Sequence, residues 1–581
     1  MDQKRLFLAI ALSIAILLGF QFLMPPPPKA VPPAPVATDA TPAPAAGTSA
    51  GAAIPGAVTR AVPATPRETP RVRFTAPRVE GSISLLGARL DNLVLRDYRE
   101  AIAADAPKVQ LLEPRGEKEP TFVQFGWTAA EGFTAALPDE ETVWTSAGEL
   151  APGKAITLSW NNGGGLTFEL VYSVDDNYLF TVDQRVRNDS GKPTALYPWS
   201  RIRRDFTPVT SGYYVLHEGM IGVLDGRLKE TTYPDAKSEG QKNKGVAMGL
   251  KGTVGWAGIT DKYWLTALVP DKAVKQDLSF RHIAGATEGY QVDFLASESQ
   301  VVAPGAVGSM KSHLFAGAKE VHLLDRYESA NAIASFDKAV DFGWFYFLTK
   351  PIFYALDWLN SVLHNFGLAI LVFTVFAKAL FFPLANKSYR SMSKMKLLTP
   401  KMTALREQYK DNQQELQKKM MEMYRQEKVN PASGCLPIII QIPVFFSLYK
   451  VIFVTIEMRQ APFFGWIHDL SVVDPTNVFN LFGLIPFDPT TLPGIGSMLH
   501  LGAWPLMMGF TMFFQQKLNP PPPDPVQAKL FQFMPIIFTF MLASFPAGLV
   551  IYWSWNNLLT ICQQWLIMRQ TNLSKPGTKA T

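Results

Sequence analysis

A long apolar stretch with one positive charge inside it constrains the fold of this chain more than any other feature. Residues 368–384 read LAILVFTVFAKALFFPL, and Lys378 is the charged residue among them. About 20 such residues cross the hydrocarbon core of a bilayer, so the stretch predicts a membrane-spanning helix. A lysine near the bilayer centre costs about 2.5–3.5 kcal/mol, which makes Lys378 a candidate functional residue. The alternative is that its long side chain snorkels toward the end of the span, at Lys387 and Arg390.

Further apolar stretches predict a protein with six transmembrane helices. Residues 6–24 are uncharged, follow Lys4 and Arg5, and are followed by prolines without a cleavage site, which indicates an uncleaved anchor. Basic residues outnumber acidic ones by roughly two to one in the block that follows the 368–384 stretch, which places that block in the cytoplasm. Both termini are then cytoplasmic. The predicted helices are 1–24, 364–384, 434–455, 498–516, 530–545 and 548–568, with a periplasmic loop at 456–497, a cytoplasmic loop at 517–529 and a cytoplasmic tail at 569–581.

A large soluble domain is predicted between the first two spans. Residues 25–77 are rich in proline and alanine and cannot bury a core, so we expect a disordered linker in the periplasm. From 78 to 325 the hydrophobic period changes to two, as in Ile156, Leu158 and Trp160, with turn residues between the runs. No helical period of comparable length interrupts this pattern. The segment therefore predicts an antiparallel β-sandwich.

Two predicted helical segments flank the 368–384 stretch. Residues 326–363 should contain connecting helices, and the aromatic part from 338 to 363 indicates an interfacial helix on the outer membrane surface. Residues 385–433 predict a cytoplasmic helical hairpin with a break at Asp411 and Asn412. Its apolar stripe contains Met395, Met402, Leu416, Met420 and Met423. Methionines suit adaptable contacts with varied partners, but the two helices could equally pack on each other.

Uncharged polar residues recur within the five predicted spans after residue 363, which contain no Asp or Glu. Tyr552, Asn556, Thr560 and Gln563 have the spacing i, i+4, i+8, i+11 and share one helix face. Similar groups are Thr374, Gln441, Thr511, Gln515, Gln532 and Thr539. They either join helices by hydrogen bonds worth about 0.6 kcal/mol each or line a hydrated groove that faces Lys378. A second basic residue, Lys450, lies seven positions before Glu457, and we expect it to snorkel to the outer interface.

Four motifs in this chain resemble the YidC family of membrane-protein insertases, in the form found in Gram-negative bacteria. They are VFAKALFFPLANKSYRSMSKMKLLTPKM, EKVNPASGCLPIIIQIPVFFSLYK, EMRQAPFFGWIHDLS and FMPIIFTFMLASFPAGLVIYWSWNNLLTICQQ. The resemblance implies that five spans enclose a hydrophilic groove whose basic residue attracts acidic parts of the incoming protein, without nucleotide hydrolysis. Lys378 has that position, where the family usually has arginine. Thr374, Tyr552 and Trp553 match positions that contact substrate.

The resemblance also implies the partners. They are nascent hydrophobic membrane proteins, the Sec translocon with its accessory subunits, the ribosome and the lipid bilayer. The hairpin matches a cytoplasmic element thought to receive substrate. The segment 479–499 is longer than in the family pattern, and the resemblance assigns it no role.

Other classes of function fit the sequence less well. A coupled transporter usually needs intramembrane acids, and an anchored scaffold needs no polar stripes in its spans. An intramembrane enzyme needs a nucleophile, acid pair or metal site, and we predict none. The two cysteines form no metal-binding pattern, so no metal or other cofactor is expected. The basic residues lie beside apolar segments, where membrane topology places them, so we expect no nucleic-acid recognition.

Overall fold

The computed structural model describes residues 69–130, 132–211, 216–285, 287–409, 412–427, 429, 436–492, 496–519 and 525–573. The predicted N-terminal anchor, most of the predicted linker and the last residues of the tail lie outside the described residues.

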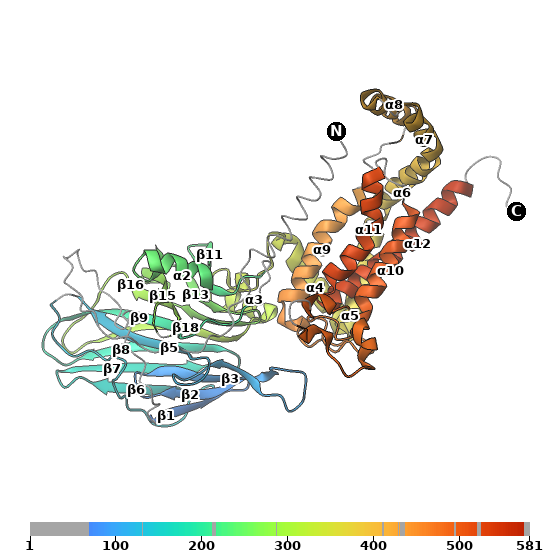
Figure 1. Ribbon diagram of the computed structural model, residues 1–581. Helices are drawn as coiled ribbons and strands as arrows, with labels where there is room; N and C mark the ends of the chain where they lie inside the picture. Colours follow the sequence, from blue (N-terminus) through green and yellow to red (C-terminus); the bar gives the residue numbers. More distant parts are fainter. Residues whose placement is uncertain are drawn as a thin grey trace, which may run out of the picture. The chain divides into compact units, whose positions relative to one another are not determined.

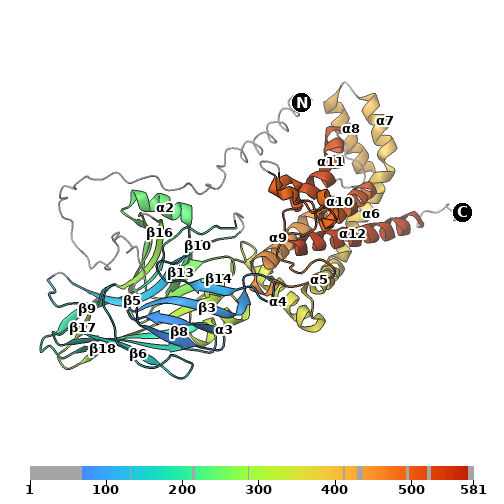
Figure 2. The same ribbon diagram turned by 60° about the horizontal axis from the view of Figure 1, so that its bottom comes forward.

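Two antiparallel sheets form the soluble domain (Figures 1 and 2). The first has the order β1-β2-β3-β5-β9-β16-β15-β12, with β4 beside β3 and β17 beside β9. The second has the order β11-β10-β13-β14-β18-β8-β7-β6. The first sheet comprises β1 (Arg71–Thr75), β2 (Val79–Ser84), β3 (Arg89–Arg99), β4 (Lys108–Leu112), β5 (Thr121–Ala129), β9 (Thr194–Arg204), β12 (Val246–Gly252), β15 (Gln276–Ile283), β16 (Gly289–Ala296) and β17 (Gln300–Val302). The second comprises β6 (Ile156–Asn161), β7 (Leu166–Val174), β8 (Leu179–Asn188), β10 (Gly219–Leu224), β11 (Arg227–Thr232), β13 (Gly255–Thr260), β14 (Trp264–Val269) and β18 (Val307–Ala318).

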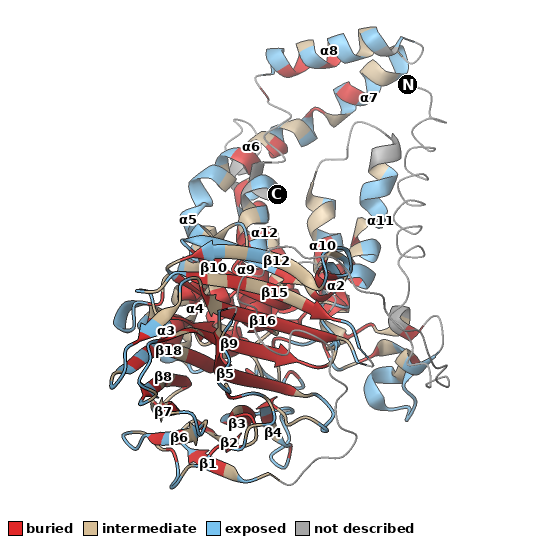
Figure 3. Cartoon of the chain, turned by 90° about the vertical axis from the view of Figure 1, so that its left-hand side faces the viewer, coloured by how far each residue is buried: buried red, intermediate tan, exposed pale blue. Residues whose placement is uncertain are grey.

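The alternating pattern of the sequence becomes a meander of three strands. β6 pairs with β7 and β7 with β8, each through a short turn at the predicted place. Ile156 and Leu158 are buried, as the period of two requires. The central strands β5 and β9 are buried on both faces, and Figure 3 shows them and β16 mostly in the colour of buried residues. The prediction of an antiparallel β-sandwich is therefore confirmed.

Two predictions about this domain are wrong. It begins at β1 and not at residue 78, because Val72 and Phe74 alternate with polar residues and enter the core. A helix, α2 (Tyr233–Lys242), also interrupts the strands. Thr232 caps it by accepting a hydrogen bond from the backbone N–H of Asp235, and the helix packs on β12 and β15. The helix is short and most of its residues are polar, so the hydrophobic pattern of the sequence did not reveal it.

Short helices connect the sandwich to the helical domain. They are α3 (Val321–Ala330), the 3-10 turn η1 (Phe336–Ala339) and α4 (Tyr346–Leu363). The predicted interfacial helix from 338 to 363 is thus shorter than expected. α4 packs against α5 and α9, and its Phe353 and Leu356 are buried, while Phe347 and Trp358 remain exposed. One face is therefore buried in protein, and the other presents aromatic side chains.

Helices α5–α12 follow, and each apolar stretch predicted after residue 363 contains one of them. They are α5 (Phe366–Leu380), α6 (Phe382–Leu397), α7 (Thr399–Gln408), α8 (Gln413–Gln426), α9 (Leu436–Val454), α10 (Ala503–Leu518), α11 (Pro525–Leu542) and α12 (Ala547–Leu573). Of the described helices, none is by itself both long and apolar enough to cross a bilayer, whereas α5 and α6 together could be, with a bend of 69° at their junction. The prediction of one continuous helix over 364–384 is therefore wrong, because α5 ends at Leu380 and α6 begins at Phe382. Pro383 supplies the reason, because it has no N–H and its ring clashes with the carbonyl one turn earlier.

Lys450 is paired with a carboxylate that the sequence analysis did not identify, and its position at the outer interface stays a prediction. Its side chain is buried in α9, and Nζ lies 2.8 Å from Oδ2 of Asp341. Asp341 belongs to the segment just before α4, and no local sequence pattern places that segment beside α9. A buried charge needs an opposite charge or hydrogen bonds, and the fold provides a carboxylate from about 110 residues away in the chain.

Candidate functional site

A cavity with several polar groups in its wall lies beside Lys378, between α5, α6, α9 and α12. Its volume is about 40 Å³, which exceeds the ~10–15 Å³ that a single water molecule needs. The lining residues are Phe373, Thr374, Ala377, Lys378, Phe381, Leu384, Ala385, Tyr389, Gln441, Val444, Tyr552, Asn556 and Gln563. Apolar side chains thus form much of the wall, and a lysine and several uncharged polar groups project between them. The cavity has room and partners for water.

The ammonium group of Lys378 is held by α12. Nζ donates a hydrogen bond to Oγ1 of Thr560 over 2.9 Å. The Thr560 hydroxyl donates in turn to the backbone carbonyl of Asn556, 2.7 Å away, and Tyr389 is hydrogen-bonded to the same hydroxyl. The Thr560 hydroxyl thus links Lys378 on α5 and Tyr389 on α6 to α12. The positive charge is therefore fixed toward the cavity and does not point along α5.

Six of the nine residues predicted for the groove line this cavity. They are Thr374, Lys378, Gln441, Tyr552, Asn556 and Gln563. Gln441 donates its side-chain N–H to the hydroxyl of Tyr552, which joins α9 to α12. Thr374 bonds to the carbonyl of Ile370 on its own helix. Among the described residues, Oδ1 of Asn556 and Nε2 of Gln563 have no hydrogen-bond partner. Two buried polar atoms are thus available to water or to a polar segment of another chain.

The other three predicted residues lie elsewhere. Gln515 on α10 is not among the residues lining the cavity, and neither are Gln532 or Trp553. Gln532 lies on a separate, mostly apolar groove between α10 and α11. The indole of Trp553 packs on Phe445 with 4.6 Å between ring centroids, and it also contacts Phe538. Helical spacing shows which residues share a face of one helix. It does not show which neighbouring helix or cavity that face contacts.

Two residues near the cavity make contacts that sequence spacing could not assign. Thr560 was part of the polar stripe, but its bond to Lys378 depends on how α5 packs on α12. Tyr389 was assigned to the cytoplasmic hairpin, yet the bend between α5 and α6 brings it to the cavity. The proline at position 383 was the available signal, because a helix usually bends or ends close to such a residue.

The methionine stripe of the hairpin packs on itself. α7 and α8 share a small core of Leu398, Met402, Met420, Met423, Tyr424 and Val429, flanked by Met395, Leu405 and Leu416. All five residues predicted for this stripe belong to it. The structure therefore favours the alternative in which the two helices pack together, and the stripe is not an open surface for other proteins. Asn412 caps α8 by accepting a hydrogen bond from the N–H of Glu415.

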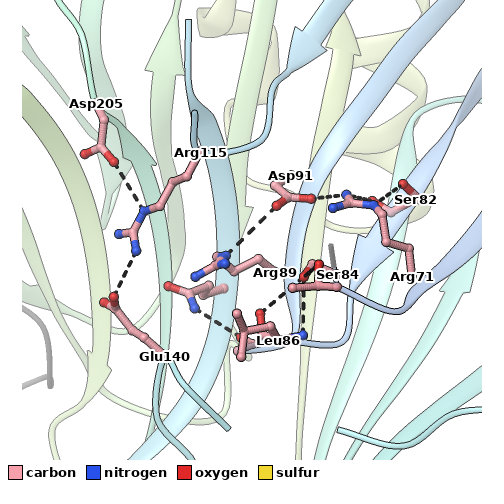
Figure 4. Close-up of polar contacts among 12 residues, drawn as sticks. Arg71, Ser82, Ser84, Leu86, Arg89, Asp91, Arg115, Glu140 and Asp205 are labelled. Carbon is pink, nitrogen blue, oxygen red and sulfur yellow. Dashed lines mark hydrogen bonds and ion pairs between the residues drawn. The ribbon is translucent and has the colours of Figure 1, made fainter. Parts of the chain in front are cut away.

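The β domain contains a second polar cluster (Figure 4). Arg115 lies between two carboxylates, 3.0 Å from Glu140 and 3.5 Å from Asp205. Asp91 lies between Arg71 and Arg89 in the same way. Burial raises the pKa of Asp91, whereas the pKa of Glu140 is lowered, because the neighbouring arginines outweigh its burial. These charges neutralise one another, which is typical of a structural ion network.

Three acidic residues near α3 approach one another closely enough to hold a cation. They are Asp325, Glu328 and Asp337. Lys350 reaches into this group, with Nζ 3.0 Å from Oδ1 of Asp325 and 2.6 Å from Oδ2 of Asp337. A lysine thus supplies the positive charge, and the cluster fastens α4 to the preceding connection.

Comparisons with known proteins agree with this architecture. Residues 71–355 match the family described as the YidC periplasmic domain, and residues 358–575 match the family described as the 60Kd inner membrane protein. The membrane protein insertase YidC of Granulibacter bethesdensis is 58% identical over 582 residues, which cover 99% of each chain. The membrane protein insertase YidC of Acidiphilium cryptum is 54% identical over 591 residues, which cover 98% of each chain.

A solved structure of an active YidC insertase with its first transmembrane domain resolved also matches. It is 18% identical, with a TM-score of 0.34, and the match covers 85% of this chain and 92% of that one. The family matches define an inner-membrane protein with a periplasmic domain. The chain belongs to the YidC family of membrane protein insertases.

Proposed function

We propose that this protein inserts hydrophobic proteins into the inner membrane by receiving a polar part of each client in the cavity beside Lys378. The observation that carries the proposal is the position of the Lys378 ammonium, held by Thr560 in a cavity large enough for water. An acidic residue in the client is attracted to this charge. The client's apolar residues remain in contact with lipid and exposed helix surfaces.

The polar lining lowers the barrier that a client meets. A peptide group moved into hydrocarbon without a hydrogen bond costs several kcal/mol. The unpartnered Oδ1 of Asn556 and Nε2 of Gln563 offer one acceptor and one donor in the cavity. A polar segment can therefore exchange part of its hydration for bonds to α12 before it reaches the other side. The hydrophobic effect then holds the inserted helices in the bilayer, so no nucleotide is needed.

The topology that fits this function has six membrane helices and two cytoplasmic termini. The β-sandwich then lies in the periplasm, and the hairpin of α7 and α8 in the cytoplasm. The excess of basic residues in the hairpin supports this orientation. The bent pair α5–α6 carries Lys378 close to its bend. Clients come from the ribosome or from the Sec translocon.

Depletion of this protein in its host tests the proposal. A small protein with two membrane spans serves as the client, and protease protection reports its insertion. We expect insertion to fail after depletion, to return with the native protein or Lys378→Arg, and to remain absent with Lys378→Glu. Lys272→Glu is the matched control, because it makes the same charge change at an exposed position of the β domain.

Purified protein in liposomes separates a failed proposal from redundancy in the cell. Normal insertion in depleted cells together with insertion by the purified protein would mean that another insertase serves this client. Normal insertion in depleted cells and no insertion in liposomes would contradict the proposed activity. Full activity of Lys378→Glu in liposomes would contradict the role of the positive charge.

A further inference from the structure

The connection between α9 and α10 exposes an unusual number of large apolar side chains. We call residues 479–492 the apolar tip. Its exposed members are Phe479, Leu481, Phe482, Leu484, Ile485, Phe487 and Leu492. Leu484 is the most accessible, with 83% of its surface exposed. Only one residue of the tip, Asp488, carries a charge. A contiguous apolar surface of this kind marks a place that contacts lipid or another protein.

The base of the connection is fixed to the start of α10. The N–H of Val478 donates to the carbonyl of Leu501 over 2.9 Å, and Nδ2 of Asn477 donates to the carbonyl of Leu499 over 2.7 Å. Asp474, which is buried, accepts a hydrogen bond from the N–H of Trp504 in the first turn of α10. The bond to Asp474 satisfies an N–H at the helix N-terminus that the side chain of Gly502 cannot cap. The tip therefore extends from a rigid base.

The backbone of the tip satisfies many of its own polar groups. Asn480 accepts from the N–H of Gly483 and donates through Nδ2 to the carbonyl of Phe487. The N–H of Phe482 bonds back to Asn477, 2.8 Å away. Leu481 and Phe482 both adopt positive φ, 51° and 58°, which is rare for bulky residues. The chain thus accepts strain in a turn that leaves both side chains about half exposed.

We propose that the apolar tip is a membrane-contact element that inserts its side chains into the lipid leaflet next to the end of α9 and the start of α10. This inference rests on the membrane location proposed above. Internal hydrogen bonding is required of a backbone that leaves water for lipid, whereas a protein partner could supply the missing bonds. Trp466 and Phe464, in the same connection, are also exposed, and tryptophan favours the interface between lipid and water. Phe510 on α10 is also exposed.

Single labels in the full-length protein test this proposal. Cys435 and Cys562 are first replaced by serine, and one cysteine is introduced at a chosen position to carry an environment-sensitive fluorophore. The purified protein is placed in phosphatidylcholine nanodiscs with or without doxyl-labelled lipid, and iodide serves as the aqueous quencher. Leu484→Cys reports on the tip, and Phe487→Cys is a second variant in case the first does not fold.

Two control positions make each outcome decisive. Phe510→Cys reports on the exposed face of α10, and Val209→Cys reports on a fully exposed position of the β domain. We expect doxyl lipid to quench the fluorescence of the tip and α10 labels, and iodide to leave it unchanged. At position 209, iodide should quench the label and doxyl lipid should not. Suppose that iodide but not doxyl lipid quenches the tip label, while doxyl lipid quenches the α10 label. This result would overturn the inference about the tip and would leave the proposed function standing.

The remaining outcomes also decide the question. A tip label that neither quencher reaches would indicate coverage by protein, such as a second copy of this chain, and would overturn the proposed lipid contact. If doxyl lipid does not reach the α10 label either, the membrane location in the proposed function fails first.

Discussion

Replacing Lys378 with methionine should remove the preference of this protein for clients with an acidic translocated segment. Methionine keeps much of the length of the side chain and loses the ammonium group that Thr560 holds in the cavity. Two opposite charges 4 Å apart interact by about 1 kcal/mol in water and about 4 kcal/mol at an effective dielectric constant of 20. The cavity of about 40 Å³ admits a few water molecules, so the value lies between these limits.

That range corresponds to about a 5- to 1,000-fold change in the population of clients engaged with the cavity. The assay compares two clients that differ by one substitution, Asp or Asn, in the translocated segment. The ratio of their insertion rates into proteoliposomes is measured for the native protein, Lys378→Met and Lys378→Arg. We expect the native protein and Lys378→Arg to favour the Asp client and Lys378→Met to lose the difference. An unchanged ratio with Lys378→Met would refute electrostatic attraction, even if both rates fell.

Three further predictions concern stability. Asp341→Asn removes the carboxylate that faces buried Lys450 and should lower the free energy of unfolding by about 3–5 kcal/mol. The thermal unfolding temperature in nanodiscs should fall accordingly, and an unchanged temperature would contradict this prediction. Burial lowers the pKa of Lys319 from 10.5 to about 8. Between pH 8 and pH 10.5, the unfolded chain therefore binds more protons at this lysine than the folded chain does. Stability should therefore rise by about 3 kcal/mol from pH 8 to 10.5, and denaturant titrations should show that Lys319→Met reduces this rise. Met420→Ala should weaken the packing of α7 on α8 by about 2 kcal/mol or more, and amide hydrogen exchange in these two helices should become faster. Met421→Ala is the control, because this residue is half exposed and its replacement should change the exchange rates little.

Local patterns determined much of what this chain forms. The alternation at Ile156 and Leu158 was sufficient to predict a strand and its hairpin, because a half-buried strand repeats every two residues. Polar residues at positions 552, 556, 560 and 563 share one face of α12 because a helix repeats every 3.6 residues. The presence of one lysine in an apolar stretch directed attention to Lys378 for an energetic reason that requires no structure. These conclusions depend on the chain's near neighbours in sequence.

Packing between distant segments decided the rest. The contact of Lys378 with Thr560 joins residues 182 positions apart, and the pairing of Lys450 with Asp341 depends on how the segment before α4 meets α9. Trp553 was expected at the groove, but its ring met Phe445 instead. A sequence gives the period of a helix and the cost of burying a charge. It does not give the rotation of one helix against another, and that rotation determines which polar groups meet around the cavity.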